Sequence, residues 1–233
     1  GRDSNVSGQA LLTSGLTAYY SDDQIIYFDL ADGNIAQAKL RLRNFRGYDE
    51  PHGRFLAGHA MGEFSRSADA EFASALGRQI GLDVGNYATS RVTAELGLAM
   101  LFTRLGLALD EQRQPQKGLL FARIATWLAP SSDAAKLGLA ELMDRQDLDT
   151  KASALLKGIA PNSPFWVQAV VNQTQLVATP EESVAIARAA SEAQPASSQL
   201  KLLYAQTLEL ADRRDLAVTV YRSLLDQDAG GTN

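Results

Sequence analysis

Residues 102–130, FTRLGLALDEQRQPQKGLLFARIATWLAP, decide how the rest of the chain is interpreted. The stretch is rich in Leu and Ala, yet it carries six charged side chains. It is therefore too polar to supply the about 18–20 apolar residues of a membrane span. Placing Leu105 on Leu139, an offset of 34 residues, aligns the stretch with the segment that follows it. Each equivalent pair then exchanges small or apolar residues. The other pairs are Gly106 and Ala140, Leu109 and Met143, Gly118 and Ala152, Ala122 and Leu156, and Ala125 and Ile159. A fixed offset of this size is typical of arrays of helix pairs, since helical character alone would set no offset.

The same offset recurs near the end of the chain. It separates Pro161 from Pro195, and each of these prolines follows an Ala-rich run that it ends, because proline cannot continue a helix. The last segment repeats the residue types at the same relative positions, with Tyr204, Ala205, Leu208, Ala217, Tyr221 and Leu224. Small residues such as Gly106 and Ala217 would let two antiparallel helices approach closely, while neighbouring large residues fill the adjoining gap.

This pattern resembles the tetratricopeptide repeat (TPR) family, whose unit is a helix–turn–helix of about 34 residues. In residues 102–130 the resemblance rests on Phe102, Leu105, Gly106, Leu109, Gly118, Ala125 and Pro130. Ala122 departs from the pattern, because the family usually has an aromatic residue there. The resemblance implies an all-α fold, a right-handed superhelical solenoid of antiparallel helix pairs, with about six pairs in this chain.

Helix-start signals set the limits of the units. Thr179 is followed by Pro180 and, three residues after the threonine, by Glu182, which together form a capping box. Ser131 or Ser132 can cap the helix that follows them. Two further starts are marked by Pro115 and Pro164. We expect units at 99–132, 133–163, 164–197 and 198–229, a tail at 230–233, and one continuous solenoid, because each unit buries its apolar face against its neighbours.

Residues 1–98 match the repeat less well, and we expect degenerate TPR-like pairs there. A turn at Gly33 follows a helix containing Ile25 and Ile26. The helix after the turn should contain Ala38, Leu42 and Phe45. Pro51 begins another pair, whose buried faces should hold Phe55, Leu56, Ala68, Phe72 and Ala75. Residues 82–90, LDVGNYATS, predict an irregular connection.

Composition narrows the classes of function. The 233 residues are 45% hydrophobic and 21% charged, which is typical of a globular chain, and the helix formers Ala and Leu dominate. The net charge of −5 argues against nucleic acid, whose phosphates require clustered Lys and Arg. The densest basic stretch is Lys39, Arg41, Arg43 and Arg46; on a helix Lys39, Arg43 and Arg46 would share a face, which we interpret as a solvated one.

Two features concern the origin of the chain. It has no cysteine, which excludes disulfides, thiolate zinc sites and cysteine nucleophiles but leaves the compartment open between bacterial cytoplasm and periplasm. It starts Gly1-Arg2-Asp3 without Met, which resembles a scar left by tag removal. Together with the degenerate, Ala- and Leu-rich repeats, this start indicates a fragment of a longer bacterial TPR protein.

Residue types that carry chemistry are sparse. His52 and His59 would lie about 10 Å apart along one helix, too far to share a metal without further ligands. The carboxylates of Asp22, Asp23, Glu63, Asp69 and Glu71 show no general acid–base spacing, and no phosphate-binding loop is present. Trp127 and Trp166 stand in apolar helical contexts, which favour packing over a ligand-stacking surface. We expect no enzymatic activity, no cofactor and no metal.

The TPR resemblance implies that the first helix of each pair lines a concave groove. Its second, fifth, ninth and twelfth positions would face a bound peptide. They carry Thr103, Leu107 and Asp110; Leu137, Glu141 and Asp144; Gln168, Asn172 and Gln175; and Gln199, Leu202, Gln206 and Glu209. Amides can pair with an extended peptide backbone, and the carboxylates favour a basic partner. The alternative is that these exposed helix faces are simply polar.

The function that follows is a non-enzymatic scaffold, which binds a partner protein or peptide through the concave face of a TPR array. Two alternatives remain open. One is a structural or self-association module, in which the exposed ends of the solenoid pair with one another. The other is an accessory helical segment of a larger enzyme or envelope-assembly protein.

Overall fold

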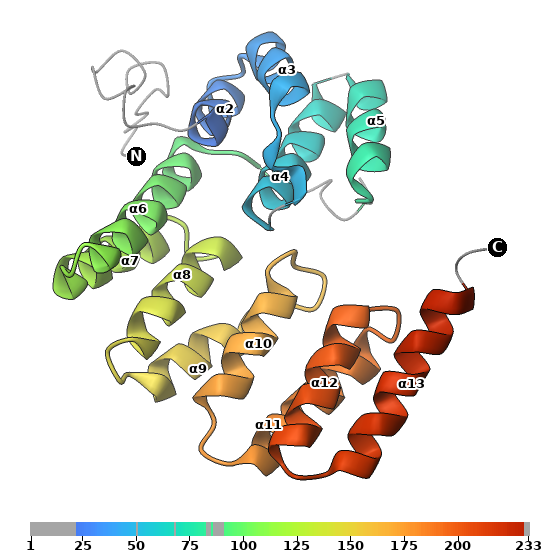
Figure 1. The fold of residues 1–233 in the computed structure, drawn as a ribbon. Coiled ribbons are helices and arrows are strands. Elements are labelled where there is room, and N and C mark those ends of the chain that lie inside the picture. The colour runs from blue at the N-terminus through green and yellow to red at the C-terminus, as the bar shows by residue number, and fades with distance from the viewer. Residues whose placement is uncertain (1–21, 50, 68, 83–84, 86–90, 231–233) are drawn as a thin grey trace. The chain divides into compact units, whose positions relative to one another are not determined.

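The structure is a computed structural model that describes residues 22–49, 51–67, 69–82, 85 and 91–230 (Figure 1). In these residues the chain forms twelve α-helices and one short 3-10 helix, and no strand. The described chain is therefore all-α, which confirms the expected fold class. It divides into two compact units, Gly1–Leu142 and Met143–Asn233.

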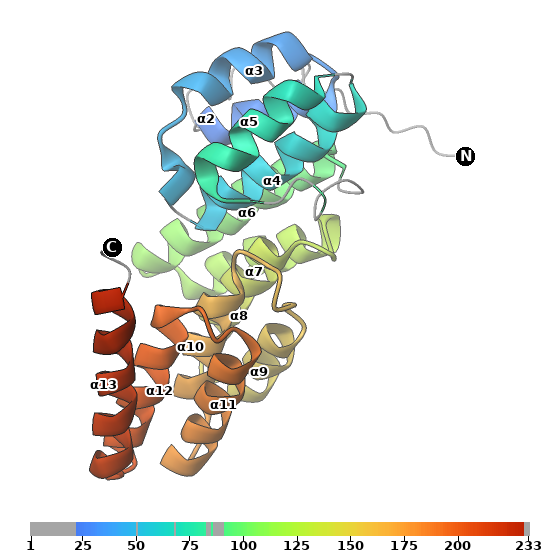
Figure 2. The same ribbon diagram turned by 90° about the vertical axis from the view of Figure 1, so that its right-hand side faces the viewer.

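The first unit is built from helix pairs that are consecutive in sequence. Its helices are α2 (Asp22–Ala31), α3 (Ile35–Asn44), the 3-10 helix η2 (Gly47–Asp49), α4 (Pro51–Arg66), α5 (Ala70–Ile80), α6 (Ala94–Glu111), α7 (Pro115–Leu128) and α8 (Asp133–Asp144), whose last two residues belong to the second unit. α2 packs on α3, α4 on α5 and α6 on α7, and α2 also contacts α4 and α6 (Figure 2). The α2–α6 contact includes an ion pair between Asp23 and Arg104, with 2.8 Å between Oδ1 and Nη1.

The second unit continues the pairing. Its helices are α9 (Asp149–Lys157), α10 (Trp166–Leu176), α11 (Pro180–Ala193), α12 (Ser198–Leu210) and α13 (Arg214–Gly230). Each packs on the next, and α10 also contacts α12. The expected ranges 99–132, 133–163, 164–197 and 198–229 hold α6–α7, α8–α9, α10–α11 and α12–α13 respectively, although α6 begins earlier, at Ala94. Gly230 is the last described residue, so the remainder of the expected tail lies outside the described residues.

One turn geometry recurs between paired helices. Gly33, Arg113, Asp147 and Asp212 all have positive φ, between 56° and 74°. At each of them the residue's N–H bonds to the carbonyl three residues earlier, and the next N–H bonds to the carbonyl five residues before it. This is the Schellman arrangement, which satisfies carbonyls left open at a helix end. Arg113 and Asp147 are separated by the offset that aligns Leu105 with Leu139, so the structure repeats at the interval found in the sequence.

A close backbone contact in the first unit joins α6 and α7 through two glycines. A Cβ added at Gly118 would lie 2.6 Å from the carbonyl oxygen of Gly106, and one added at Gly106 would lie 2.8 Å from that of Gly118. α8 also lies close to α6, but there a glycine faces a side chain: a Cβ at Gly138 would lie 2.5 Å from Cγ2 of Thr103. The small residues therefore bring backbones together, as the sequence pattern predicts for Gly106.

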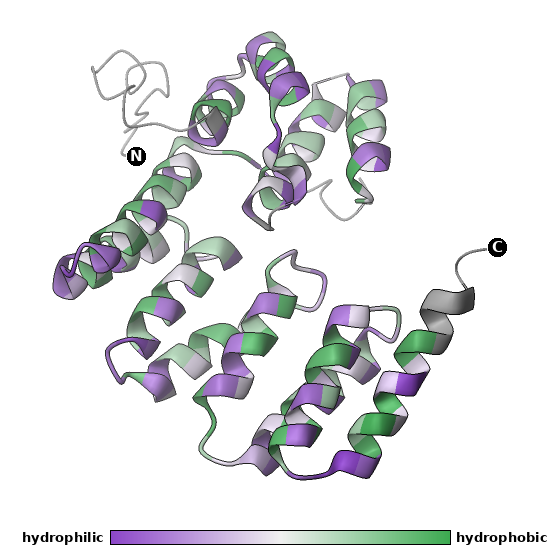
Figure 3. Ribbon diagram, viewed as in Figure 1, coloured by the Kyte–Doolittle hydropathy of each residue, from purple (hydrophilic) through white to green (hydrophobic). Residues whose placement is uncertain are grey.

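Most helices carry both an apolar and a polar side (Figure 3). Polar residues gather at the α6–α7 turn, and apolar ones form the core. Ala38 and Leu42 lie in α3, as expected, but Phe45 follows the end of that helix at Asn44. Of the residues expected to be buried in the next pair, Phe55 and Leu56 are buried, Phe72 is half-buried, and Ala68 lies outside the described residues. Ala75 is exposed, because Ala73 and Leu76 occupy the buried side of α5 instead. That expectation was wrong by part of a turn.

Four of the five expected helix starts are confirmed, one of them at Pro51, the first residue of α4. The Thr179 hydroxyl accepts the Glu182 N–H at 3.3 Å, and that of Ser132 accepts the Ala135 N–H at 3.3 Å. Pro115 is the first residue of α7. Pro164 does not start a helix, since α10 begins at Trp166.

The basic stretch of residues 39–46 lies partly within α3. Lys39 pairs with Asp69, and Arg41 Nε pairs with Asp29 Oδ2 at 2.8 Å. Arg46 lies beyond the end of α3 at Asn44, so it does not share a helix face with Lys39 and Arg43, and that expectation was wrong. Burial raises the pKa of the Asp29 carboxyl in spite of Arg41, so this ion pair holds a carboxylate in an unfavourable environment.

Candidate interaction surface

The groove residues expected in the first unit do not form an exposed row. Thr103 is only 1% exposed, its hydroxyl donates to the Ala99 carbonyl at 2.8 Å, and its methyl group touches Gly138. Thr103 is therefore a packing residue, and the expectation that it faces a partner does not fit this burial. The remaining first-unit residues divide by exposure: Leu107, Asp110 and Glu141 are half-buried, and Leu137 is buried.

The groove residues in the second unit lie on the surface of two neighbouring helices. On α12, Gln199, Leu202, Gln206 and Glu209 are exposed and follow one another at intervals of three or four residues, which places them on one helix face. The opposite side of α12 buries Leu200, Ala205, Thr207 and Leu208. α12 therefore presents a continuous polar row with one apolar side chain within it.

α10, which contacts α12, has a similar exposed side. Gln168 and Gln175 are exposed, and Asn172 is half-buried between them. Gln168 Nε2 donates to Asn172 Oδ1 at 2.8 Å, so one turn of the helix orders both amides. The buried side of α10 holds Trp166, Ala169 and Val170. We refer to the exposed residues of these two helices as the amide surface: Gln168, Asn172, Gln175, Gln199, Leu202, Gln206 and Glu209.

Glu209 is the carboxylate of the amide surface, and its position is held from α13. The Tyr221 hydroxyl donates to Glu209 Oε2 at 2.9 Å. Burial and this hydrogen bond both raise the pKa of Tyr221, so the phenol stays protonated and continues to donate. The charge of Glu209 is therefore oriented by a neighbouring helix. Asp144, at the end of α8, is also exposed.

A pocket of about 280 Å³ in the first unit was not foreseen from the sequence. It is lined by Phe45, Arg46, Tyr48, Asp49, Arg54, Gln79 and Ile80. Two polar side chains of the lining bond to the backbone: Arg54 Nη1 donates to the Ile80 carbonyl at 2.9 Å, and the Tyr48 hydroxyl donates to the Leu42 carbonyl at 2.6 Å. Burial raises the pKa of Tyr48 to about 12, so its phenol is no base at neutral pH. The lining residues supply no nucleophile paired with a base.

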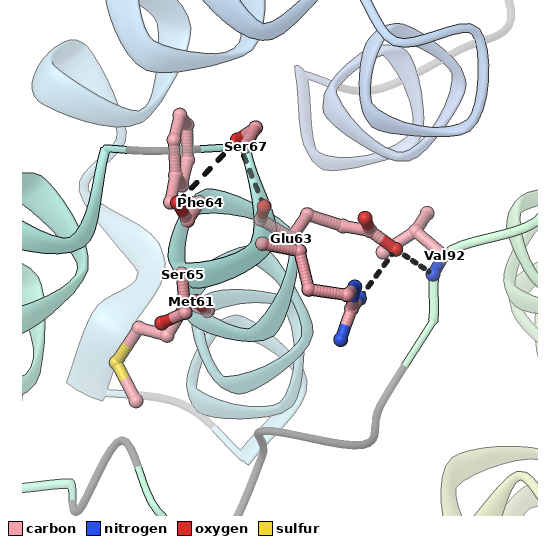
Figure 4. Close-up of polar contacts among 7 residues, drawn as sticks. Met61, Glu63, Phe64, Ser65, Ser67 and Val92 are labelled. Atoms are coloured by element: carbon pink, nitrogen blue, oxygen red, sulfur yellow. Dashed lines mark hydrogen bonds and ion pairs between the residues drawn. The ribbon is translucent and has the colours of Figure 1, made fainter.

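Glu63 on α4 joins two segments of the chain (Figure 4). Its Oε1 accepts the Val92 N–H at 2.7 Å and pairs with Arg66 Nη2 at 2.8 Å. Because Val92 directly precedes Thr93, the N-cap of α6, this carboxylate ties the start of α6 to α4. The Ser65 and Ser67 hydroxyls donate to the carbonyls of Met61 and Glu63 on α4. The contacts drawn in Figure 4 therefore stabilise α4 and link it to the start of α6.

His52 and His59 both lie on α4, as expected. Within the described residues, Nδ1 of His59 is buried and has no hydrogen-bond partner. The Phe55 and His59 rings pack edge to face, with 4.4 Å between their centroids. Burial lowers the pKa of His59 to about 4, so the ring is neutral at neutral pH. Among the described residues, no group of three His, Asp or Glu side chains is placed to hold a metal ion.

The two tryptophans differ. Trp166 is 9% exposed and packs as expected. Trp127 is 77% exposed on α7, so the expectation that it packs in the core was wrong. Apolar residues lie on almost every side of the helix at 115–128. The sequence therefore does not show which side stays exposed.

No protein-family model matches the chain, and no curated protein sequence matches it significantly. None of the described helices is both long and apolar enough to cross a membrane.

Proposed function

We propose that the protein is a non-enzymatic interaction scaffold, a TPR-like right-handed solenoid of about six helix pairs that binds a segment of a partner protein. The repeated turn supports the TPR-like arrangement, since Arg113 and Asp147 adopt the same conformation at the offset of the sequence repeat. The observation that carries the binding role is the amide surface, where two neighbouring helices expose polar rows on the sides turned away from their cores.

The chemistry of the amide surface fits an extended peptide. Each Gln or Asn side chain offers both donors and acceptors, which can pair with the N–H and C=O groups of a peptide backbone. Leu202 supplies an apolar contact between the amides. Glu209 favours a peptide that carries Lys or Arg, because complementary charges steer association and reject acidic sequences.

A test uses the full chain and synthetic peptide arrays, in which extended peptides differ only in the number of Lys or Glu residues. We expect Lys-containing peptides to bind and Glu-containing ones not to bind. Glu209→Gln removes the charge and keeps an acceptor for Tyr221, and it should weaken binding about two- to fivefold, as expected for one exposed charge pair. Glu192→Gln is the matched control, because Glu192 is an exposed carboxylate on α11 whose partner is Arg188.

Charge reversal at Asp110, Glu141 and Asp144 tests the wider groove, and it should weaken capture while helicity by circular dichroism stays unchanged. Equal binding of Lys and Glu peptides, or equal losses in Glu209→Gln and Glu192→Gln, would show that the amide surface is only a solvated helix face.

A further inference from the structure

The outer face of α7 carries an unusual apolar strip. Leu120 and Trp127 are 55% and 77% exposed, and half-buried Ile124 lies between them. Their spacing of four and three residues places them on one side of the helix. The other side of α7 buries Gly118, Leu119, Ala122 and Ala125, which includes the contact with α6. We refer to Leu120, Ile124 and Trp127 as the α7 strip.

Cations flank the α7 strip. Lys117 and Arg123 are exposed on either side of it, and α7 contains no Asp or Glu, although the whole chain has a net charge of −5. Lys117 donates to the Gln114 side chain at 2.8 Å. In the part of the chain that the structure describes, neither Lys117 nor Arg123 forms an ion pair. The strip therefore combines an exposed indole with uncompensated positive charge.

We propose that the α7 strip is a docking site for an amphipathic helix of a partner protein, whose apolar side is flanked by Asp or Glu. Three anchors at i, i+4 and i+7 extend about 10 Å along α7, which matches the spacing that a second helix presents. Trp and Arg are the residues that most often dominate binding at such contacts. The carboxylates of the partner would pair with Lys117 and Arg123 at the rim.

Electrostatic repulsion disfavours two other occupants of the α7 strip, a second copy of the chain and an anionic membrane. A second copy of the chain docked through the same strip would bring its own Lys117 and Arg123 to this face, and like charges disfavour that pairing. An anionic membrane would attract these two cations, but it would repel a chain with a net charge of −5. A short acidic helix would bring its charge only to the side of Lys117 and Arg123, whereas a membrane would also face the acidic remainder of the chain, and exposed charges farther apart than about 8 Å are largely screened.

Trp127 is itself the reporter for the test, because the chain has only two tryptophans and Trp166 is buried. The probes are two synthetic helical peptides with the same Leu stripe, one flanked by Glu and the other with Lys in place of every Glu. We expect the Glu peptide to shift the emission of the full chain to the blue and to protect it from iodide quenching. It should bind about tenfold more tightly than the Lys peptide, from two rim charge pairs.

Variants assign the signal to the strip. Lys117→Glu together with Arg123→Glu should reverse the preference between the peptides. Leu120→Ala should weaken the Glu peptide at least about fivefold, whereas Leu210→Ala, an equally drastic change at another exposed leucine, should not. Gln206→Ala should also leave binding unchanged, because Gln206 belongs to the amide surface; a loss there would assign the peptide to that surface and overturn the proposal.

Other outcomes also overturn the proposal. They are absence of any Trp127 response to the Glu peptide, equal response to both peptides, a blue shift that follows the chain's own concentration and reports self-association, and a stronger response to phosphatidylglycerol vesicles than to the Glu peptide. None of them bears on the amide surface, so a failure here is distinguishable from a failure of the proposed function.

Discussion

Replacing Gly118 by Ala should destabilise the first unit, even though alanine is the better helix former. Gly118 lies inside α7, where a Gly-to-Ala change in an open helix gains about 1 kcal/mol. Here the new Cβ would lie 2.6 Å from the Gly106 carbonyl oxygen, against 3.4 Å or more for an ordinary contact. α6 and α7 would have to separate by about 0.8 Å, the difference between these two distances.

The cost of that separation sets the magnitude. The obstructing atom belongs to the backbone, so no side chain can turn aside, and overpacking of this kind costs about 3 kcal/mol at the upper end of its range. After the gain in helix propensity, Gly118→Ala should lower the free energy of unfolding by about 2 kcal/mol. At roughly 4 °C per kcal/mol, the melting temperature should fall by about 8 °C.

Urea unfolding followed by circular dichroism gives the free energy, and hydrogen exchange resolved to α6 and α7 assigns the loss to this contact. Gly158→Ala is the control, because Gly158 caps α9 in a right-handed conformation and the nearest atom to its Cβ is 3.3 Å away. Its effect should stay within about 0.5 kcal/mol. Gly106→Ala combined with Gly118→Ala should cost less than the sum of both, since one separation relieves both contacts. A Gly118→Ala chain as stable as the parent would refute the reasoning.

Three further changes test other parts of the first unit. Glu63→Ala leaves the Val92 N–H without its acceptor and should cost about 1–3 kcal/mol, with faster hydrogen exchange at Val92 as the specific sign. His59 has a folded pKa of about 4, below the 6.5 of an unfolded histidine, so the unfolded chain binds the proton first as the pH falls. Stability is therefore full above about pH 6.5 and lost toward pH 4, by about 2 kcal/mol between pH 7 and pH 5, a loss that urea titrations should not show in His59→Gln. Arg113→Gly relieves a left-handed conformation and should add up to about 1 kcal/mol in the same titrations; a loss of stability would show that the Arg113 side chain contributes more than its backbone costs.

Local signals in the sequence predicted much of the fold. The starts at Pro115, Ser132 and Thr179 follow from single side chains next to a helix end, which is why they could be identified without tertiary information. Gly106 was recognised as a close-approach position because its equivalent, Ala140, is also small. These features depend on neighbours within one helix pair, and sequence spacing reports such neighbours directly.

The parts that sequence reasoning missed depend on contacts between pairs. Thr103 is buried because Gly138 of α8 lies against it, and nothing in the α6 pattern reports what α8 brings to that position. The Asp23–Arg104 ion pair joins α2 to α6 across the intervening helices. Stacking each pair only on the next does not account for this contact. Alternation along a helix shows how polar each side is, but not which side a distant helix will cover.

The close α6–α7 contact and the α7 strip lie on opposite sides of the same helix, so the contact supports the strip. A rigid support lowers the entropy lost when a partner docks, and α7 is held in part by backbone-to-backbone contact at Gly118. Leu120, only two residues later, points to the opposite side of the same turn. Any displacement of α7 in Gly118→Ala therefore moves the strip as a body, without changing its exposure or its charge. The Glu-flanked peptide should then bind nearly as well to Gly118→Ala as to the parent chain at temperatures where both are folded, because docking onto one helix requires the spacing within α7 and not its distance from α6.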